Sequence, residues 1–382
     1  VMILIASVMP VMAIIALVPV LPLLLREFAG VSGSEFLVPI AMTVPALCVA
    51  LFSPLAGWLS DRLGRKNLLV GSMLLYAGFG IIPWFLDDLF QIIAVRIALG
   101  VVEAMIMTVA TTLIGDYFEG EKRERWIALQ VAAASLSAIV LIAAGGILGE
   151  VLGSRGPFLM YLLALPAAAA AAAILFEPAA SQSGGTHHEV RFPLAAIAPL
   201  VLTTLFVGVV FYTIIVQLGP ILETPGAVSP GMIGMIGAAC NCAVGLGSLV
   251  FHKAKEHVGP RLLATGLVIA TLGYAGASLG TTLPVIAAFV ILASIGSGIM
   301  LPNMLTWTMS CLPPQMRGRG MGLWTGAFFL GQFVAPLLAA AIVGVTGTMA
   351  SMLLAYATIM GAAAVVAMLI SRLSAKTANA AA

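Results

Sequence analysis

The ten residues Gly57-Trp58-Leu59-Ser60-Asp61-Arg62-Leu63-Gly64-Arg65-Lys66 form the most informative stretch of the chain. They carry one acidic and three basic side chains between two long apolar segments. Glycine permits tight turns and close approach of backbones, so Gly57 and Gly64 indicate a compact turn. The stretch therefore predicts a short, positively charged loop that joins two apolar helices.

The composition of the whole chain excludes a water-soluble protein. Of its 382 residues, 62% are hydrophobic and only 8% are charged, and the mean hydropathy is +1.15. A soluble domain carries about 25% charged residues, which form its water-facing surface. The net charge of +2 is too small to indicate a nucleic-acid partner, and the sequence contains no P-loop or dinucleotide-binding glycine motif. We therefore predict a polytopic membrane protein with no cofactor, no metal site and no nucleic-acid partner.

Apolar segments of about 20 residues recur along the chain, each long enough to cross a hydrocarbon core of ~30 Å. They lie near residues 2–25, 36–58, 67–86, 90–115, 126–149, 157–176, 194–218, 230–251, 261–279, 283–309, 319–345 and 348–371. The longest polar break, Glu177–Arg191, divides six segments from six. The expected fold is an all-α polytopic membrane protein, with twelve transmembrane helices in two pseudo-symmetric six-helix bundles. These bundles cover residues 1–176 and 194–382, and a cytoplasmic linker loop at 177–193 joins them.

The basic residues predict how the segments are oriented. Apart from Arg96, which lies inside an apolar segment, the odd-numbered loops contain only Arg26 and Arg155. All the other basic residues fall in the even-numbered loops or at the C-terminus. Because loops rich in lysine and arginine stay in the cytoplasm, we expect both termini to be cytoplasmic. The protein is then an integral component of the inner or plasma membrane, in contact with the lipid bilayer.

The two halves carry similar loop sequences at matching positions, which indicates an internal duplication. SDRLGRKNLL from Ser60 matches KEHVGPRLLA from Lys255, so that Gly64 aligns with Gly259 and Asp61 with Glu256. A second pair, RERWIAL from Arg123 and RGRGMGL from Arg317, has nearly the same offset. Parallel repeats of this kind are typical of transporters, whose substrate site lies between the halves near the middle of the bilayer.

Glu103 is the only carboxylate that the hydropathy pattern places near the middle of the membrane, and it shares its segment with Arg96. An ionisable group in hydrocarbon costs at least ~2.5–3.5 kcal/mol, so its default interpretation is functional. Arg96, Gly100 and Glu103 share one helix face, and the two charges lie roughly 10 Å apart along the axis. Water or substrate is therefore expected between them rather than a tight ion pair. The alternative is a purely structural hydrogen bond between helices.

The charged loop resembles the signature G-x-L-x-D-R-x-G-R-[KR] of the major facilitator superfamily, and the resemblance extends over the whole chain. It implies a conformational latch formed by Gly57, Asp61, Arg62, Gly64 and Arg65, in which the acid holds the two halves together on the cytoplasmic side. Plain topology signals would explain the arginines equally well. The family's R-x-x-x-G pattern appears as Arg96 and Gly100. In proton-coupled members that arginine is implicated in proton transfer, which implies a proton-coupling role for Arg96 and Glu103.

Two further stretches bear on the subgroup. Gly331-Gln332-Phe333-Val334-Ala335-Pro336 resembles the pattern of the twelve-helix drug/proton antiporters, and Pro10, Pro19 and Pro22 in the first segment fit that group. The residues 143–149 (AAGGILG) are rich in glycine, but they lack the Gly-Pro dipeptide that antiporters of the family usually carry. This departure weakens the resemblance to antiporters.

Few polar or aromatic residues are placed at a depth suitable for contacting a substrate. The candidates are Phe206, Tyr212, Gln217, Asn241, Asn303, Trp307, Trp324, Phe328 and Gln332. For any single aromatic residue among them, helix packing or contact with lipid is the alternative role. An apolar cavity with few hydrogen-bonding groups favours amphipathic molecules over sugars as substrates.

These observations predict a secondary active transporter that works by alternating access as a functional monomer. The leading hypothesis is proton-coupled export of lipophilic or amphipathic small molecules, and the partners are then a small-molecule substrate and protons. The alternative is a symporter or facilitator for uptake of a small organic anion, with Arg96 as counter-charge. An enzyme is not expected, because the intramembrane residues offer no nucleophile–base pair.

Overall fold

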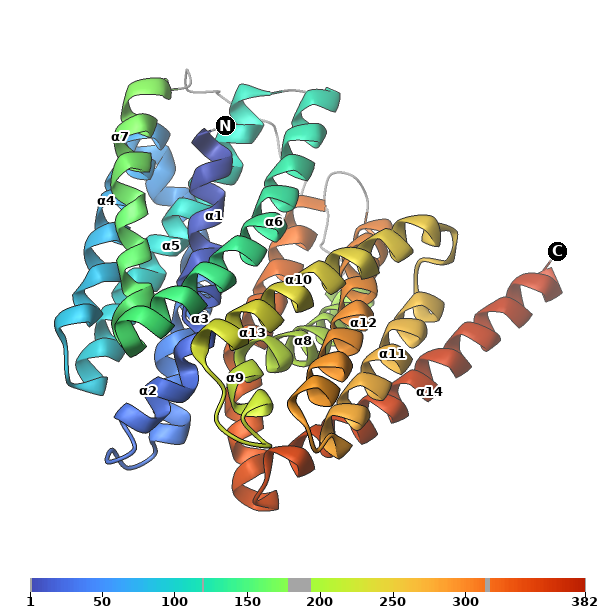
Figure 1. Ribbon diagram of the computed structural model, residues 1–382. Coiled ribbons are helices and arrows are strands. Elements are labelled where there is room, and N and C mark those ends of the chain that lie inside the picture. Colours follow the sequence, from blue (N-terminus) through green and yellow to red (C-terminus); the bar gives the residue numbers. More distant parts are fainter. Residues whose placement is uncertain (1, 119, 178–193, 313–316, 382) are drawn as a thin grey trace. The chain divides into compact units, whose positions relative to one another are not determined.

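The computed structural model describes residues 2–118, 120–177, 194–312 and 317–381, and within these ranges the chain is helical and forms no strand (Figure 1). It divides into two compact units, the N-terminal unit (Val1–Phe192) and the C-terminal unit (Pro193–Ala382). The predicted linker at 177–193 lies outside the described residues, apart from Glu177.

The N-terminal unit contains seven α-helices and three 3₁₀ segments within its described part. In chain order these are α1 (Met2–Ile15), η1 (Val18–Val20), α2 (Leu21–Glu27), α3 (Ser34–Leu63), α4 (Arg65–Ile81), η2 (Ile82–Phe85), α5 (Leu89–Tyr117), α6 (Gly120–Leu152), η3 (Gly153–Leu163) and α7 (Ala164–Ile174). The first membrane crossing is broken between α1 and α2, where the prolines Pro19 and Pro22 fall. Proline lacks the amide hydrogen that continues a helix, which explains the break.

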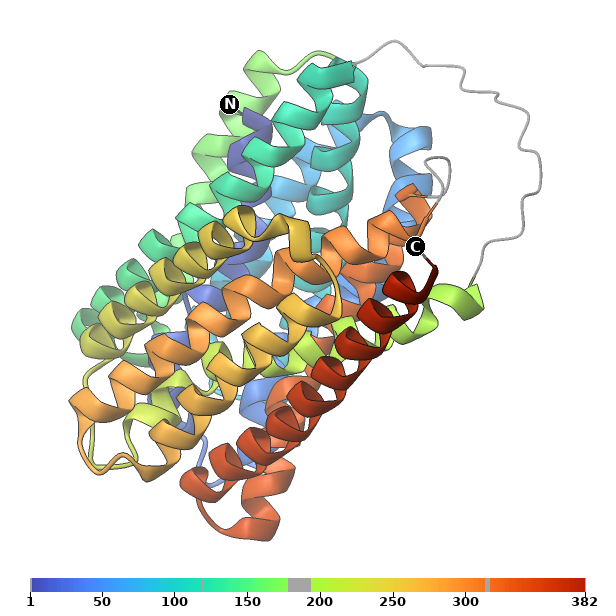
Figure 2. The ribbon, with the colours of Figure 1, turned by 90° about the vertical axis from the view of Figure 1, so that its right-hand side faces the viewer.

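The described part of the C-terminal unit contains α8 (Leu194–Val216), α9 (Leu218–Leu222), α10 (Pro230–Lys253), η4 (Lys255–His257), α11 (Pro260–Leu279), α12 (Leu283–Ser310), α13 (Arg317–Thr346) and α14 (Met349–Ala381). Within this unit α14 lies alongside α11 (Figures 1 and 2). Small residues allow close packing of the helices. For example, a Cβ on Gly273 of α11 would lie 2.5 Å from the Cβ of Ala293 on α12.

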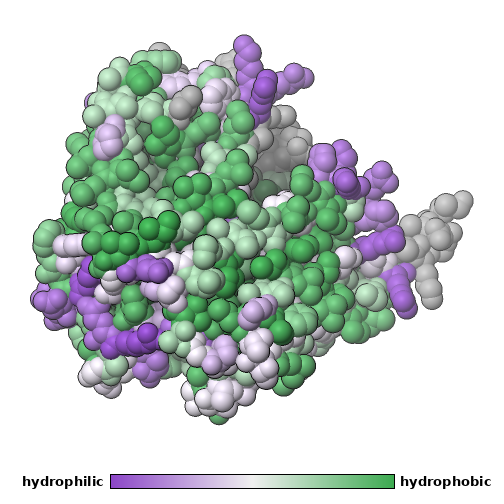
Figure 3. Space-filling view, in the orientation of Figure 1, coloured by the Kyte–Doolittle hydropathy of each residue, from purple (hydrophilic) through white to green (hydrophobic). Residues whose placement is uncertain are grey.

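The lengths of the helices confirm the twelve-helix fold. Eleven helical runs in the described ranges are long and apolar enough to span a membrane. One of them, Gly120–Ile174, has 55 residues and would measure ~80 Å as a single helix. It consists of α6 followed by η3 and α7, and therefore crosses twice. Large apolar side chains such as Val140, Ile147 and Leu249 are exposed on the helices, and Figure 3 shows hydrophobic side chains over much of the visible face. The protein is an integral membrane protein.

A pair of buried tyrosines recurs in both units and supports the duplication. In the N-terminal unit the rings of Tyr76 and Tyr161 lie 5.2 Å apart, and the Tyr76 hydroxyl donates to the carbonyl of Met9 on the first helix. In the C-terminal unit the rings of Tyr274 and Tyr356 lie 5.8 Å apart, and the Tyr274 hydroxyl donates to the first helix of that unit, at the Val210 carbonyl. The same device therefore holds the first helix of each bundle.

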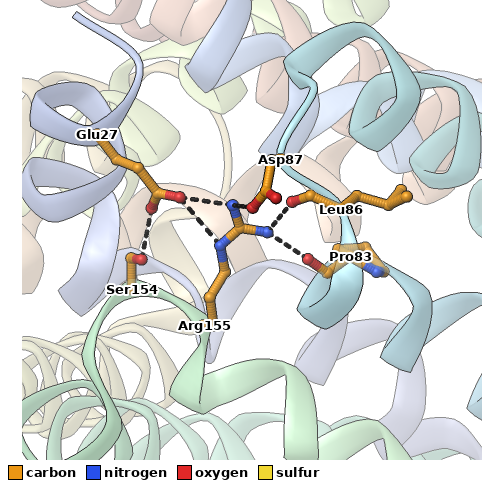
Figure 4. A network of polar contacts seen from close by, with 6 residues as sticks. All are labelled: Glu27, Pro83, Leu86, Asp87, Ser154 and Arg155. Carbon is orange, nitrogen blue, oxygen red and sulfur yellow. Dashed lines mark hydrogen bonds and ion pairs between the residues drawn. The ribbon is translucent and has the colours of Figure 1, made fainter.

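A single arginine ties together three connecting segments of the N-terminal unit. Arg155 on η3 pairs with Glu27 at the end of α2 and donates to the carbonyls of Pro83 and Leu86 (Figure 4). The Ser154 hydroxyl donates to the other oxygen of Glu27. These bonds explain why Arg155 occurs in an odd-numbered loop that otherwise carries little positive charge.

Candidate functional site

Helix α5 brings the two charged residues of the predicted site into the interior of the N-terminal unit. Asp88 starts the helix, because its side chain accepts hydrogen bonds from the amides of Phe90 and Gln91. Farther along the same helix, Arg96 is 1% exposed and Glu103 is 2% exposed. Both charged groups are therefore removed from solvent, and each of them requires a partner or a function.

The Arg96 guanidinium is held by protein groups from three other segments. Its Nε donates to the Ala41 carbonyl at 2.9 Å, and its Nη2 donates to the carbonyls of Ala13 at 2.6 Å and Met42 at 3.1 Å. Its Nη1 donates to the hydroxyl of Tyr161, which in turn donates to the Ala13 carbonyl. Arg96 therefore links α5 to α1, α3 and η3.

Proline and the break in the first helix make these carbonyls available. Ala41 lies four residues before Pro45, which has no amide hydrogen, so the Ala41 carbonyl has no partner within α3. Ala13 lies just before the end of α1, where the amide of Leu17 bonds to the Ile14 carbonyl instead. Freed carbonyls inside a membrane protein must find other donors. Arg96 supplies them from the middle of α5.

In contrast to the Arg96 guanidinium, the Glu103 carboxylate has too few hydrogen-bond partners. Its Oε2 atom is buried and has no hydrogen-bond partner among the described residues, and no ion pair within 4.0 Å joins it to Arg96 there. The absence of a tight pair agrees with the helix spacing. Protein carbonyls accept three of the hydrogen bonds that Arg96 donates, and the water or substrate expected between the two charges stays a prediction.

Gly100 allows a neighbouring helix, rather than a ligand, to approach α5. A Cβ at this position would lie 2.5 Å from the Cα of Pro45 and 2.7 Å from the Cβ of Cys48. Helix α3 therefore packs directly against α5 between the two charges. The residue between the two charged positions on this face of α5 is therefore in contact with α3.

The charged loop forms a turn between α3 and α4 with Gly64 at its centre. Gly64 has φ +83° and ψ +146°, a backbone conformation that residues other than glycine rarely adopt. The Glu177 carboxylate accepts hydrogen bonds from the amides of Arg65 and Lys66 at 2.6 Å and 2.9 Å. A Cβ on Gly64 would lie 3.1 Å from the Glu177 carboxylate, so the glycine also provides room for this cap.

The other predicted latch residues have separate contacts. The Arg65 guanidinium pairs with Asp116 at the end of α5, and the Arg62 guanidinium lies 4.1 Å from the centre of the Trp58 ring. Gly57 lies inside α3, where a Cβ would be in ordinary contact with Thr108. The side chain of Asp61 lies outside the described part of the chain, so the latch assigned to it stays a prediction. Asp116 and Glu177 were not among the predicted site residues, and their position after an apolar segment was their only signal in the sequence.

In the C-terminal unit, three of the predicted substrate residues lie in one aromatic cluster. The Phe328 ring on α13 stacks on Trp324, 5.4 Å away, and lies 5.0 Å from Tyr212 on α8. Phe211, which was not among the predicted residues, lies 5.7 Å from Phe328. Helices α8 and α13 approach closely here because Gly208 faces Gly331. We call Phe211, Tyr212, Trp324 and Phe328 the aromatic cluster.

Asn303 and Trp307 lie elsewhere in that unit, at the loop before α11. The Asn303 amide accepts a hydrogen bond from the Gly259 amide at 2.8 Å and donates to the Gly259 carbonyl at 3.0 Å. A Cβ on Gly259 would contact the Trp307 ring. Both of these hydrogen bonds of Asn303 hold the loop before α11, and neither of them involves the aromatic cluster.

The remaining predicted substrate residues are dispersed. Gln217 precedes α9 and is 5% exposed, Gln332 on α13 is also 5% exposed, and Phe206 on α8 is half-buried. Asn241 on α10 lines a small pocket together with residues of α8 and α12. Phe211 also lines this pocket, so it connects the predicted residue Asn241 to the aromatic cluster.

Comparison with known proteins shows the family to which the chain belongs. The chain matches the Major Facilitator Superfamily over residues 3–226 and 200–381. It is 24% identical over 344 residues to the multi-drug resistance efflux pump PmrA of Streptococcus pneumoniae, covering 84% of this chain and 83% of that protein. It is 30% identical over 186 residues to the class G tetracycline resistance protein of Vibrio anguillarum, covering 49% of this chain and 46% of that protein.

A solved structure shows the same fold. The crystal structure of a bacterial homologue of the human lysosomal transporter Spinster, in an inward-facing and occupied conformation, superimposes with a TM-score of 0.78 at 17% identity. The match covers 97% of this chain and 96% of the other. Because the family match covers nearly the entire chain, the resemblance seen in the charged loop is confirmed. The chain belongs to the major facilitator superfamily and is a membrane transporter, not an enzyme.

Proposed function

We propose that this transporter exports lipophilic or amphipathic small molecules in exchange for protons across the inner or plasma membrane. The observation that supports the proposal best is the Glu103 carboxylate, which is buried in the N-terminal unit with an oxygen that has no partner among the described residues. A buried carboxylate that lacks a fixed counter-charge gains from taking up a proton. Glu103 is therefore the proposed proton carrier, protonated from one side of the membrane and deprotonated on the other during alternating access.

The substrate class follows from the predicted contact residues and from the relatives. The aromatic cluster offers large flat surfaces with few polar atoms, which suit an apolar or aromatic substrate. One relative is a multi-drug resistance efflux pump and another is a tetracycline resistance protein. Both names support export of organic compounds as the function of this chain.

Arg96 has a supporting part in this proposal. Its hydrogen bonds to Ala13, Ala41, Met42 and Tyr161 use four of its five N–H donors. An arginine engaged in this way is a poor counter-charge for a substrate, which disfavours the alternative of organic-anion uptake. We propose instead that Arg96 holds α1 and α3 in place around Glu103.

The test is transport by purified protein in liposomes under an imposed pH gradient. Two probes are used: ethidium, a lipophilic cation, and 7-amino-4-methylcoumarin, a neutral flat aromatic molecule. Glu103→Gln should abolish the part of their movement that the gradient drives. The variant should exchange labelled for unlabelled probe at equal pH as fast as the wild type does, because exchange requires no net proton movement. Glu35→Gln, which changes an exposed carboxyl at the start of α3, serves as the matched control.

Three outcomes would contradict the proposal. Gradient-driven transport by Glu103→Gln at the wild-type rate would exclude Glu103 as the proton carrier. Failure of the wild-type protein to move either probe would exclude export of this class of compound. Accumulation of an organic acid such as benzoate with the proton gradient, without export of the probes, would establish the uptake alternative.

A further inference from the structure

The small pocket in the C-terminal unit brings together polar side chains and contains no charged residue in its wall. Helix α8 contributes Phe211, Ile214 and Ile215 to its wall, and α10 and α12 contribute the rest. Its polar residues are Cys240 and Asn241 on α10 and Ser294 and Ser297 on α12. We call this the α8–α10–α12 pocket.

Ser297 is the first sign that the pocket is made for a ligand. Buried hydroxyls in the helices of this unit usually donate to the carbonyl four residues earlier, as Thr204, Thr213 and Ser294 do. Ser297 is only 3% exposed as a whole residue, and its hydroxyl has no hydrogen-bond partner among the described residues. Ser297 lies in the wall of the pocket, so this hydroxyl is available to a group that enters the pocket. It could donate one hydrogen bond to a ligand and accept another from it.

Asn241 is the second sign. Its side-chain nitrogen donates to the Gly237 carbonyl of its own helix at 3.0 Å. Its side-chain oxygen and second amide hydrogen have no partner among the described residues, and the residue lines the same pocket. Ser297 and Asn241 together therefore offer both donors and an acceptor, from two different helices.

The surroundings define the chemistry that this pair would recognise. The wall of the pocket holds no charged residue, so a charged group placed there would lose its hydration without gaining a counter-ion. An uncharged carbonyl, amide or hydroxyl would gain hydrogen bonds instead. Phe211 belongs both to this pocket and to the aromatic cluster, so a ligand's apolar body has an adjacent surface of rings.

We infer that the α8–α10–α12 pocket is the polar subsite for substrate, and that it binds an uncharged hydrogen-bonding group attached to a flat apolar body. Asn241 and Ser297 recognise that group, while the aromatic cluster receives the body. The inference rests on the proposed export function for its biological meaning. It adds that neutral substrates are selected in the C-terminal unit, whereas the proposed proton carrier Glu103 belongs to the N-terminal unit.

The experiment measures equilibrium binding to the purified transporter by calorimetry, without any gradient. The first probe is 7-amino-4-methylcoumarin, which carries a lactone carbonyl, and the second is N-methylquinolinium, a flat cation of similar size without hydrogen-bonding groups. Asn241→Leu and Ser297→Ala should each weaken coumarin binding by about tenfold, the effect of one lost hydrogen bond of ~1.4 kcal/mol. Binding of the quinolinium should change less than about twofold.

Ser248→Ala is the matched control on α10. Its hydroxyl donates to the carbonyls of Val244 and of Gly298 on α12, so the variant loses a bond between the same two helices without altering the pocket's polar residues. It should leave coumarin affinity unchanged. If Ser248→Ala weakens binding as much as Ser297→Ala does, general loosening of the helices explains the effect and the subsite is excluded.

The inference is also overturned if the wild-type protein does not bind the coumarin, or if Asn241→Leu and Ser297→Ala bind it as the wild type does. An equal loss of quinolinium binding would assign the pocket to aromatic molecules in general and refute its selection of uncharged polar groups. None of these binding results depends on Glu103→Gln. Failure of proton coupling and failure of the polar subsite are therefore separate outcomes.

Discussion

Replacing Arg96 by leucine removes the donor for four acceptors but leaves only one of them without another partner. The Ala13 carbonyl keeps the Tyr161 hydroxyl, which donates to it at 3.0 Å. The Met42 carbonyl lies within α3 and has the amide of Ala46 four residues later. The Ala41 carbonyl loses its donor completely, because position 45 is proline.

The magnitude follows from this count. One buried carbonyl left unpaired costs about 1–3 kcal/mol, whereas four independent charged hydrogen bonds would sum to several times more. Removal of the buried cation also relieves its own desolvation, which opposes the loss. We therefore expect Arg96→Leu to lower the free energy of unfolding by about 1–3 kcal/mol.

Pro45→Ala provides a direct check of this reasoning. Alanine restores an amide hydrogen that can donate to the Ala41 carbonyl, so the double variant should recover most of the loss. The expected coupling in the double-mutant cycle is about 1–3 kcal/mol. Unfolding is measured by titrating each purified variant from mild detergent into sodium dodecyl sulfate and following helix content by circular dichroism. Additivity within about 0.5 kcal/mol would refute the role assigned to the Ala41 carbonyl.

The same double variant separates support of the fold from proton transfer. If Arg96 acts by holding α1 and α3 around Glu103, the restored Arg96→Leu/Pro45→Ala protein should transport the probes under a pH gradient. If the guanidinium takes part in moving the proton, the stable double variant should exchange probe at equal pH but fail to use the gradient. The second result would contradict the positioning role.

Two further predictions concern packing and a loop. Gly100→Ala should lower the free energy of unfolding by about 1–3 kcal/mol, because its Cβ would lie 2.5 Å from the Cα of Pro45. Gly71→Ala, with nothing within 4 Å, should cost nothing in the same titration, and equal costs for the two would contradict the packing argument. Asn303→Leu should remove both hydrogen bonds to Gly259 and speed amide hydrogen exchange in residues 255–259, measured by mass spectrometry. Unchanged exchange would show that the loop does not depend on Asn303.

The fold could be predicted from the sequence because a lipid environment leaves few choices. Backbone groups in hydrocarbon must be paired within the segment, so each long apolar run becomes a helix. The helical run Gly120–Ile174 is continuous in the structure, yet it contains two crossings, which the sequence separates into apolar segments at 126–149 and 157–176. The glycine at 153, which has φ +73°, marks the turn between them. Hydropathy and the glycine turn therefore agree on where one crossing ends and the next begins.

The site could be predicted only in part, because side-chain partners depend on the packing of helices distant in sequence. The positions of Arg96 and Glu103 in one buried helix followed from hydropathy and helical spacing. The partners of Arg96 did not, since carbonyls of α1 and α3 are invisible as a sequence motif. Asn303 illustrates the same limit, because a polar residue in an apolar segment indicates a substrate contact and a loop clamp equally well.

The contrast between Arg96 and Glu103 now gives the R-x-x-x-G pattern a physical reason in this chain. Pro45 and the break after α1 leave carbonyls unpaired in the interior, and a fixed cation on α5 is the side chain that can pair several of them at once. Gly100, one turn later, is what allows α3 to come close enough for those bonds. With its N–H donors directed to carbonyls and a hydroxyl, Arg96 does not neutralise Glu103 by a direct ion pair. The carboxylate is therefore free to take up the proton that we propose it carries during transport.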